Sequence, residues 1–500
     1  MAITGVPAGT IAPAPAQQTL ASNYIDFTNG TNDWAQQYLP DLMEKEAEIF
    51  GNRTISGFLS QVGAEEAMTA DQVVWSEQGR LHLSYTATVV GAGDVNGTLA
   101  IIGDIDGDTT VGNATSRTHS IRVNDTVLIA QAGKVVKALV VETPDSNVVS
   151  VEPYAEATLT AAGLTDATAT VLVIGSEYGK GQSYSDVTGT FSSDRREAIS
   201  PTFKHFDNKP IIMKDYYEVS GSDASQVGWV EVSGEEGQSG YMWYLKAAGD
   251  TRARFTDYLE MSMIEAEKTV GNSAIGFANK QIRGAADSGA GGSGTEGLFA
   301  AIEARGNLTS GVTGVNAATD LAEFDAILAE FDKNGAIEEN MMFVNRATSL
   351  AMDDMLASMN SYGAGGTSYG VFDNSEDMAL NLGFSGFRRG SYDFYKSDFR
   401  YLNDKATRGG INDAAGSAAI RGVIIPAGVS SVYDQQLGKN MKRPFLHVRY
   451  RASQTDDRRM KTWVTGSVGA TTSALDAMQV HYLSERCLIV QGANNFMLMN

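Results

Sequence analysis

The sequence contains a single cysteine, Cys487, among 500 residues, so no disulfide bond can form within the chain. Its five histidines include no pair four residues apart, and with one cysteine they form no zinc-binding pattern. No apolar run reaches the roughly 18 residues that a membrane-spanning helix needs. The first 25 residues carry no charged side chain, which excludes the basic start of a secretory signal. We therefore expect a protein made in the cytosol, with no membrane span and no metal ligands.

Basic residues are also scarce, since 38 lysines and arginines against 60 aspartates and glutamates give a net charge of −22. Such a balance argues against tight, non-specific binding of nucleic acid by the whole surface. The hydrophobic content of 43% is that of a globular protein. A chain of 500 residues is too long for one ordinary hydrophobic core, so we expect about two to four domains.

One short pattern resembles a catalytic motif without its usual surroundings. Residues 366–370 match the nucleophile elbow around Ser368, but a glycine-rich stretch precedes them where the elbow needs a buried strand. His447 and His481 lie downstream, so chain order does not exclude a triad. A chance match in a loop is the favoured interpretation, and a hydrolase is a distant alternative.

Two further patterns resemble ligand-binding motifs. Residues 289–294 match G-x-G-x-x-G, but a helix rather than a strand leads into them, so a linker is the better account. The aspartates at positions 104, 106 and 108 have the spacing of calcium ligands, yet Thr109 and Thr115 replace the glycine and glutamate of an EF-hand loop. We therefore predict no catalytic residue, no metal ligand and no cofactor.

Residues 241–283 show the period of one long helix. Apolar or small residues, Phe255 and Leu259 among them, recur in steps of three and four, and charged residues occupy the opposite side. At about 1.5 Å per residue such a helix is about 60 Å long, far above the usual three turns. Gly271 and Gly276 could end it sooner, so its last turns stay open. A compact enzyme rarely needs such a rod, whereas a protein that tiles a surface does.

The first 40 residues combine prolines, which favour extended backbone, with apolar residues such as Ile3, Val6 and Ile11. An arm that lies across a neighbouring subunit fits both facts, and a disordered terminus is the alternative. Residues 41–50 predict a short helix that ends at Gly51.

Residues 70–90 predict a β-hairpin with a turn near Gly79. Residues 91–180 differ in composition: they lack tryptophan, are rich in Val, Ile, Thr, Ala and Gly, and contain five short strand patterns. We interpret them as an inserted small β-barrel or sandwich. Residues 191–219 return through strand-like pieces, and Pro201 and Pro210 confine those pieces to sheet edges or to the starts of strands.

From Leu298 onward helix and strand patterns alternate, which predicts an α/β layer domain. Asp320, with Glu323 three residues later, predicts the start of a helix that Gly335 ends. Asn345 is expected to cap the next helix. Strands are expected at residues 341–344, 391–395, 422–425, 445–450 and 482–490, and the apolar residues 494–500 are expected to be paired.

Two basic clusters stand out in this acidic chain, one within residues 388–400 and one within residues 439–461. Arginine pairs well with carboxylates at interfaces, so we predict subunit–subunit contacts there, with a solvated face as the alternative. The candidate contact residues are Arg388, Arg389, Arg443, Arg449, Arg458 and Arg459.

The order of these parts resembles the major capsid proteins of tailed bacteriophages, which have the Hong Kong 97 type of fold. The apolar arm is MAITGVPAGTIAPAPAQQTL, and the extended loop is VVWSEQGRLHLSY with its return near residues 181–204. The spine helix is YMWYLKAAGDTRARFTDYLEMSMIEAEKTV, and the axial domain includes MMFVNRATSLAMDDM. Within that family the chain looks most like the capsid proteins of crAss-like phages of gut bacteria.

The resemblance implies an α+β fold divided into five parts. These are an N-terminal arm and short helix (residues 1–50), an extended loop (51–90 and 181–205), the inserted all-β domain (91–180), a peripheral domain with the spine helix (206–297 and 480–500) and an axial α/β domain (298–479). Many relatives carry a charged helical scaffolding segment at the N-terminus. Here Met1 leads straight into the arm, so we expect none, and no lysine is marked for a crosslink.

The function implied is that of a major capsid protein rather than an enzyme. Copies would form hexamers and pentamers of an icosahedral head shell that encloses double-stranded DNA without reading its sequence. Portal, decoration or scaffolding proteins of the same virion are the implied partners, with assembly in the host bacterial cytoplasm. The alternative is another virion or surface structural protein, such as a decoration, tail or adhesin module.

Overall fold

A computed structural model gives the fold of the chain. It describes residues 57–59, 64–77, 82, 84–104, 119–181, 204–224, 232–233, 239–240, 243–269, 294–335, 337–361, 386–413, 419–427, 429–434, 439–467 and 474–500. The described residues divide into two compact units. The main unit holds those up to Thr69 and from Pro210 onward, and the barrel unit spans Ala70–Lys209.

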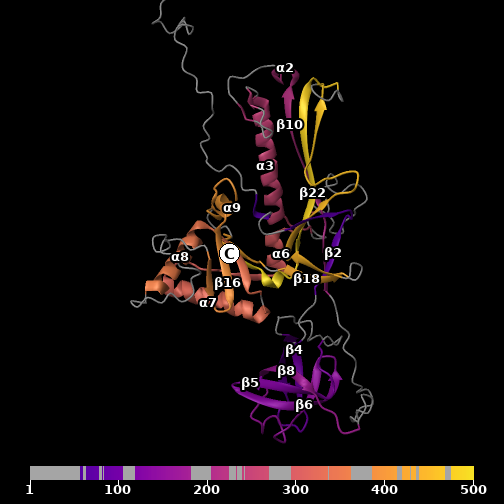
Figure 1. Cartoon of the computed structure of the whole chain (residues 1–500). Helices are drawn as coiled ribbons and strands as arrows, with labels where there is room; N and C mark the ends of the chain where they lie inside the picture. The colour runs from indigo at the N-terminus through magenta and orange to yellow at the C-terminus, as the bar shows by residue number, and fades with distance from the viewer. Residues whose placement is uncertain are drawn as a thin grey trace, which may run out of the picture. The chain divides into compact units, whose positions relative to one another are not determined.

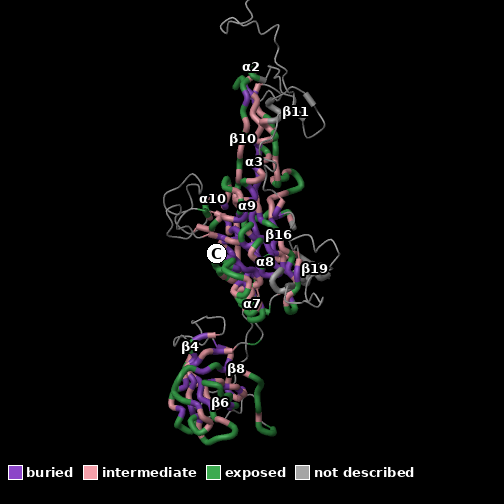
Figure 2. Tube along the Cα trace, turned by 90° about the vertical axis from the view of Figure 1, so that its left-hand side faces the viewer, coloured by how far each residue is buried: buried purple, intermediate pink, exposed green. Residues whose placement is uncertain are grey.

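Six strands of the barrel unit close into a barrel (Figure 1). Around the barrel they are β3 (Ser84–Val90), β4 (Gly97–Asp104), β7 (Val148–Pro153), β6 (Lys134–Asp145), β5 (Asp125–Gln131) and β8 (Thr168–Ser176). Buried residues alternate with more exposed ones along these strands (Figure 2), because successive side chains point into and out of the barrel. Leu159 and Leu164, from the segment between β7 and β8, are fully buried and complete the core.

The hairpin expected over residues 70–90 is wrong. β2 (Val73–Glu77) pairs antiparallel with β9 (Lys204–Asn208), while β3 joins the barrel. Trp75 of β2 is buried, and its ring centroid lies 6.2 Å from that of Phe206 on β9. On β3 the inward-pointing Tyr85 and Val89 are buried in the barrel core. The apolar side chains of β2 and β3 therefore pack in different places, those of β2 against β9 and those of β3 inside the barrel.

A five-stranded sheet and one long helix form the first layer pair of the main unit. The strand order is β1 (Ala64–Met68), β20 (Leu446–Arg451), β22 (Ala477–Val490) and β10 (Ile211–Ser220), and β21 (Lys461–Gly466) pairs with the first half of β22. Helix α3 (Trp243–Glu265) runs beside β10 and β22 (Figure 1). Phe255 and Leu259 of α3 pack on Tyr482 of β22, so the apolar stripe of the helix covers one face of this sheet.

Helix α3 is shorter than predicted, because it ends at Glu265 rather than near residue 283. Its 23 residues correspond to about 35 Å. The next carbonyl group, that of Ala266, accepts a hydrogen bond from Gly297 N–H at 2.8 Å, just before helix α6 (Leu298–Arg305) begins. A Cβ at Gly297 would lie 2.7 Å from Ala266 N, so the lack of a side chain there lets a second segment meet the end of α3.

A six-stranded sheet forms the second layer of the main unit. Its order is β13 (Asn307–Thr309), β23 (Met497–Met499), β17 (Gly422–Pro426), β14 (Glu339–Val344), β16 (Tyr392–Asp398) and β15 (Gly386–Arg389). Helices α7 (Ala317–Asn334) and α8 (Arg346–Ser361) cover one face through Phe324, Phe331 and Met355. Pairing of β23 confirms that the apolar C-terminal residues are not loose.

The ends of the two helices test the predicted caps. Thr348 N–H donates to the Asn345 side chain at 2.8 Å, which confirms the cap of α8. Gly335 ends α7 in the left-handed region, with φ of 61°, as predicted. The predicted start of α7 is wrong, because Asn316 rather than Asp320 caps it and accepts from an N–H group three residues later. Asp320 and Glu323 instead accept hydrogen bonds from the loop before the helix.

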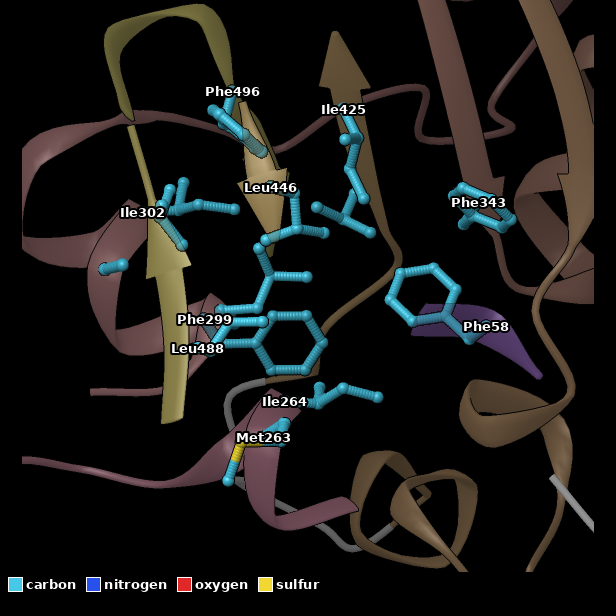
Figure 3. Close-up of a cluster of buried hydrophobic side chains, with 14 of the residues drawn as sticks. Phe58, Met263, Ile264, Phe299, Ile302, Phe343, Ile425, Leu446, Leu488 and Phe496 are labelled. Carbon is cyan, nitrogen blue, oxygen red and sulfur yellow. The ribbon is translucent and has the colours of Figure 1, made fainter. Parts of the chain in front are cut away.

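One hydrophobic core joins the two sheets of the main unit (Figure 3). Met263 and Ile264 of α3, Phe343 of β14 and Leu488 of β22 belong to it. Phe58 enters the same core, with its ring centroid 4.7 Å from that of Phe343. The sheets therefore share apolar residues rather than meeting through a linker.

Sheet membership differs from the predicted boundaries of the peripheral and axial parts. β20 and β21 lie within residues 298–479, yet they belong to the five-stranded sheet beside α3. β23 lies within residues 480–500, yet it belongs to the six-stranded sheet. Both exchanges follow from long-range pairing, since β20 and β21 pair with the long strand β22 while β23 pairs with β13 and β17.

The remaining elements are short. They are α2 (Gly221–Ala224), β11 (Val232–Ser233), β12 (Ser239–Gly240), α9 (Arg400–Asn403), α10 (Arg408–Asn412), β18 (Val429–Asp434), β19 (Lys439–Pro444) and η3 (Ala493–Asn495). The predicted arm and helix (residues 1–50), the elbow-like residues 366–370 and two of the three spaced aspartates lie outside the described residues. No helix in the described part of the chain is long and apolar enough to cross a membrane.

Candidate functional site

Three of the six predicted arginines converge on the five-stranded sheet. Arg449 of β20 lies directly opposite Glu66 of β1 in the parallel register, and their side chains form an ion pair at 2.7 Å. β1 is only five residues long and pairs with β20 alone among the described strands. This ion pair therefore supports a strand that few backbone hydrogen bonds hold.

The opposite face of β1 carries a second set of charges. Glu65 forms an ion pair with Arg459 and lies 3.8 Å from Arg486 of β22. Successive residues of a strand point to opposite faces, so Glu65 and Glu66 fix β1 from both sides of the sheet. β1 directly precedes the barrel unit, which makes it the anchor of the outgoing chain.

Glu485 of β22 gathers two further guanidinium groups. Its carboxylate lies 2.7 Å from Arg451 and 2.9 Å from Arg458, and its side chain is only 7% exposed. A buried carboxylate is costly unless it is paired and hydrogen-bonded, and two arginines satisfy that need. Arg458, predicted as an interface residue, thus has a partner within its own chain.

Helix α3 adds one carboxylate to this region. Glu260 is buried and accepts a hydrogen bond from Gly57 N–H at 2.6 Å. Burial raises the pKa of Glu260, and hydrogen bonds from the backbone N–H groups of Gly57 and Phe58 partly offset that shift. Burial likewise lowers the pKa of the nearby Arg486, whose guanidinium donates to the backbone oxygen of Arg459 at 2.8 Å.

The other predicted arginines lie elsewhere. Arg389 of β15 donates two hydrogen bonds to Asp325 of α7, at 2.5 and 2.7 Å, and this hydrogen bonding raises its pKa. Arg388 lies 3.5 Å from Asp393. The side chain of Arg443, on β19, lies outside the described residues. The structure therefore brings together Arg449, Arg458 and Arg459 but not all six.

A row of aromatic rings on the five-stranded sheet was not predicted. Tyr216 of β10, His481 of β22 and Trp463 of β21 are directly opposite one another in register. The His481 ring centroid lies 5.9 Å from that of Tyr216 and 5.1 Å from that of Trp463, with the rings stacked. The row lies on the face away from α3, since the adjacent residue Tyr482 contacts the helix. Alternation along β10 is visible in the sequence, but the row depends on strand register.

These groups form a network of ion pairs and stacked rings. Burial raises the pKa of Cys487 to about 12, so its thiol stays protonated at neutral pH. Among the described residues no group of three His, Cys, Asp or Glu side chains could hold a metal ion. The charges of Glu65, Glu66 and Glu485 pair with arginines inside the chain, which makes them suited to fixing the orientation of strands.

Comparison with known proteins gives limited similarity. No protein-family model and no curated protein matches the chain. A structure from Microbacterium phage Oxtober96 is 9% identical, with a TM-score of 0.38 over 93% of this chain and 97% of that one. One from Mycobacterium phage Ogopogo is 9% identical, with a TM-score of 0.36 over 93% and 98%. The capsid of an empty GTA particle is 11% identical, with a TM-score of 0.35 over 93% and 97%. All three TM-scores are below 0.5, so the likeness in fold is weak.

Proposed function

We propose that this chain is the major capsid protein of a tailed bacteriophage and that copies of it build the icosahedral head shell. One observation supports this most strongly: α3 lies along the long strands β10 and β22, and the core at its end also contains the six-stranded sheet. Such a subunit has two layers that share one hydrophobic core, as a building block of a shell wall needs.

The charged network has a defined role in this proposal. Glu65 and Glu66 hold β1 on both faces of the sheet, immediately before the chain enters the barrel unit. In the shell, β2, β9 and the barrel would form contacts beyond the main unit, so their attachment has to resist force. Ion pairs on both faces add to the few backbone hydrogen bonds that hold this short strand.

The finer parts of the proposal concern assembly. Copies join as hexamers and pentamers, with residues 1–50 as an arm over a neighbour and residues 51–90 with 181–205 as the extended loop. Residues 91–180 form the inserted all-β domain together with β3, which lies within the range of the predicted loop but belongs to the barrel. The peripheral part comprises residues 206–297 and 480–500, and the axial part residues 298–479, apart from the exchanged strands reported above. The shell encloses double-stranded DNA without sequence-specific contacts, which suits a net charge of −22.

The partners of the proposed shell are the portal, decoration or scaffolding proteins of the same virion, and assembly takes place in the host bacterial cytoplasm. We propose that the nearest relatives of this chain are the capsid proteins of crAss-like phages. Among the six arginines, Arg388 and Arg459 are the best candidates for contacts between subunits, because the side chain of each is 54% exposed despite its partner in the chain. The side chains of Arg389, Arg449 and Arg458, the others of the six that the structure describes, are less exposed.

Sedimentation of the purified protein tests the proposal. We expect particles of uniform size, far larger than any small oligomer, when the full chain is expressed with or without its neighbouring gene products. A decoration, tail or adhesin protein would stay a small oligomer in both cases, because it needs a surface made by another protein. Small oligomers under both conditions would therefore contradict the proposal and favour that alternative.

A further inference from the structure

Among the described residues of the main unit, the outer edge of β10 has no strand partner. β10 pairs with β22 from Ile211 to Ser220, and no other described strand pairs with it. Its second edge presents backbone groups to a further strand. The Tyr216 N–H donates to the Asp215 side chain at 2.9 Å, so that side chain has to give way before Tyr216 N–H can bond to another strand. Long exposed edges are templates for pairing with another chain.

The side chains of β10 alternate between two environments. Ile212, Lys214, Tyr216 and Glu218 are exposed on the face away from α3. Asp215 belongs to the opposite face and lies 3.3 Å from Arg254 of α3. On the exposed face, therefore, Tyr216 stands between a positive charge and a negative charge, each two residues away.

We propose that a second copy of this chain pairs with this edge, β10 against β10, antiparallel and related by a two-fold axis at Tyr216. The contact deepens the proposed function and rests on it, since a shell supplies neighbouring copies. With the axis perpendicular to the sheet, the same faces of the two copies lie on the same side. Each residue then lies opposite one whose number differs from its own by an even amount.

The charges on β10 favour this register over those centred on Lys214, Asp215 or Glu218. Centred on Tyr216, Lys214 lies opposite Glu218 of the second copy, and the pair occurs twice. Centring the axis on Lys214, Glu218 or Asp215 would place two like charges directly opposite one another, which destabilises a strand pair. Opposite charges in one register and like charges in others give specificity more than affinity.

The aromatic row supports the same centre independently. Trp463 and His481 stack in line with Tyr216, and the row ends there because β10 is the last described strand. Tyr216 is 57% exposed. A second copy placed on the two-fold axis would add its own Tyr216 next, so the row would continue through six rings. Directly opposite aromatic side chains stabilise paired strands.

The contact is small. It pairs residues 212–220 of both copies, well under the roughly 800 Å² per partner of a stable complex. We therefore expect it to form mainly where other contacts hold two copies close together, at the high effective concentration of an assembled particle. Unassembled chains at high concentration should form the β10–β10 contact to a lesser extent.

Disulfide trapping in the full chain tests the register. Tyr216→Cys places two thiols opposite one another, with Cβ atoms about 5 Å apart, within reach of a disulfide after small shifts. Lys214→Cys alone should give no dimer, because its symmetry mate lies about 14 Å away. A mixture of Lys214→Cys and Glu218→Cys should give a mixed dimer. Cys487 is buried and does not compete, and Tyr258→Cys on α3, exposed but off the edge, is the control.

Charge exchange gives a second readout. Lys214→Glu should reduce the dimer yield of Tyr216→Cys about tenfold, because it creates two like-charge pairs. Adding Glu218→Lys to the same chain should restore the yield, since the opposite charges are then exchanged. Loss of yield without restoration would overturn the predicted pairing.

The outcomes separate this contact from the shell itself. Oxidation is performed on sedimented particles if they form, and on the concentrated chain if they do not. Particles without the Tyr216→Cys dimer would overturn the contact and leave the shell standing. The predicted pattern of dimers without particles would keep the contact and overturn the shell. Equal yields at Tyr216, Lys214 and Tyr258 would indicate random collision and overturn the contact. If Tyr216→Cys fails to fold, the Lys214 and Glu218 mixture decides the register.

Discussion

Glu265, the last residue of α3, accepts a hydrogen bond from the Tyr401 hydroxyl group at 2.9 Å. Its second carboxylate oxygen lies 2.8 Å from the guanidinium group of Arg408. A carboxylate at the C-terminus of a helix opposes the helix dipole, and the arginine offsets that cost. Glu265 therefore ties the end of the long helix to the segment that carries α9 and α10.

Replacing this carboxylate should weaken the main unit. We expect Glu265→Ala to lower its free energy of unfolding by about 1–3 kcal/mol, because Arg408 and Tyr401 lose a partly buried partner. Glu303→Ala, on the exposed side of α6, should change the same quantity by less than about 0.5 kcal/mol. Calorimetry of both variants measures the difference. Equal effects would show that the contacts of Glu265 with Tyr401 and Arg408 do not stabilise the main unit.

The barrel depends on one glycine in particular. A Cβ at Gly97 would lie 2.3 Å from Cδ1 of Leu159, which is fully buried and cannot move aside without disturbing the core. Gly97→Ala should therefore destabilise the barrel unit by about 1–3 kcal/mol. Gly93→Ala is the matched control, since the nearest atom to its Cβ would be 3.9 Å away. Calorimetry should show only the barrel transition shifting in Gly97→Ala, and an equal shift in Gly93→Ala would contradict this packing.

Glu260 should give the main unit a measurable pH dependence. Burial raises its pKa above the ordinary value of 4.5, so the folded chain binds this proton more tightly than the unfolded chain. Its contribution to stability is therefore complete below about pH 4.5 and is lost as the pH rises through the folded-state pKa. Glu260→Gln keeps an oxygen for Gly57 N–H but cannot titrate. The stability of this variant relative to the natural chain should rise between pH 4 and pH 7, whereas a constant difference would contradict the buried charge.

Substitutions of two arginines should distinguish an effect on folding from an effect on assembly. Arg449→Ala removes the ion pair with Glu66 beside the short strand β1, so we expect a loss of about 1–3 kcal/mol in the free energy of unfolding of the main unit. Arg388→Ala removes a half-exposed side chain and should leave stability within about 0.5 kcal/mol. If Arg388 contacts a neighbouring subunit, the yield of particles falls in that variant although the chain stays folded. Unchanged particle yield would remove Arg388 from the interface.

Local signals in the sequence predicted much of the fold. Asn345 and Gly335 mark helix ends through chemistry confined to a few residues, and both predictions are confirmed. The strands β4 to β8 overlap the five predicted short strands. The predicted hairpin over residues 70–90 failed because β2 pairs with a strand more than a hundred residues away. The end of α3 was missed because the segment that meets it, at Gly297, comes from elsewhere in the chain.

The candidate site was predictable only in part, for the same reason. Arginine-rich residues 439–461 were visible as a cluster, but their partners Glu65, Glu66 and Glu485 are brought to them by strand register. The sequence could not show which arginines have carboxylates within the chain. Tyr216 likewise gains its significance only from the strands beside it.

Electron cryomicroscopy of the purified protein tests the central claim most directly. We expect closed icosahedral shells whose walls consist of hexamers and pentamers of this chain, with α3 and the five-stranded sheet visible in each subunit. A uniform small oligomer, seen alone and after expression with neighbouring gene products, would contradict a shell-forming role. The same result would assign the chain to a protein that binds a surface made by others.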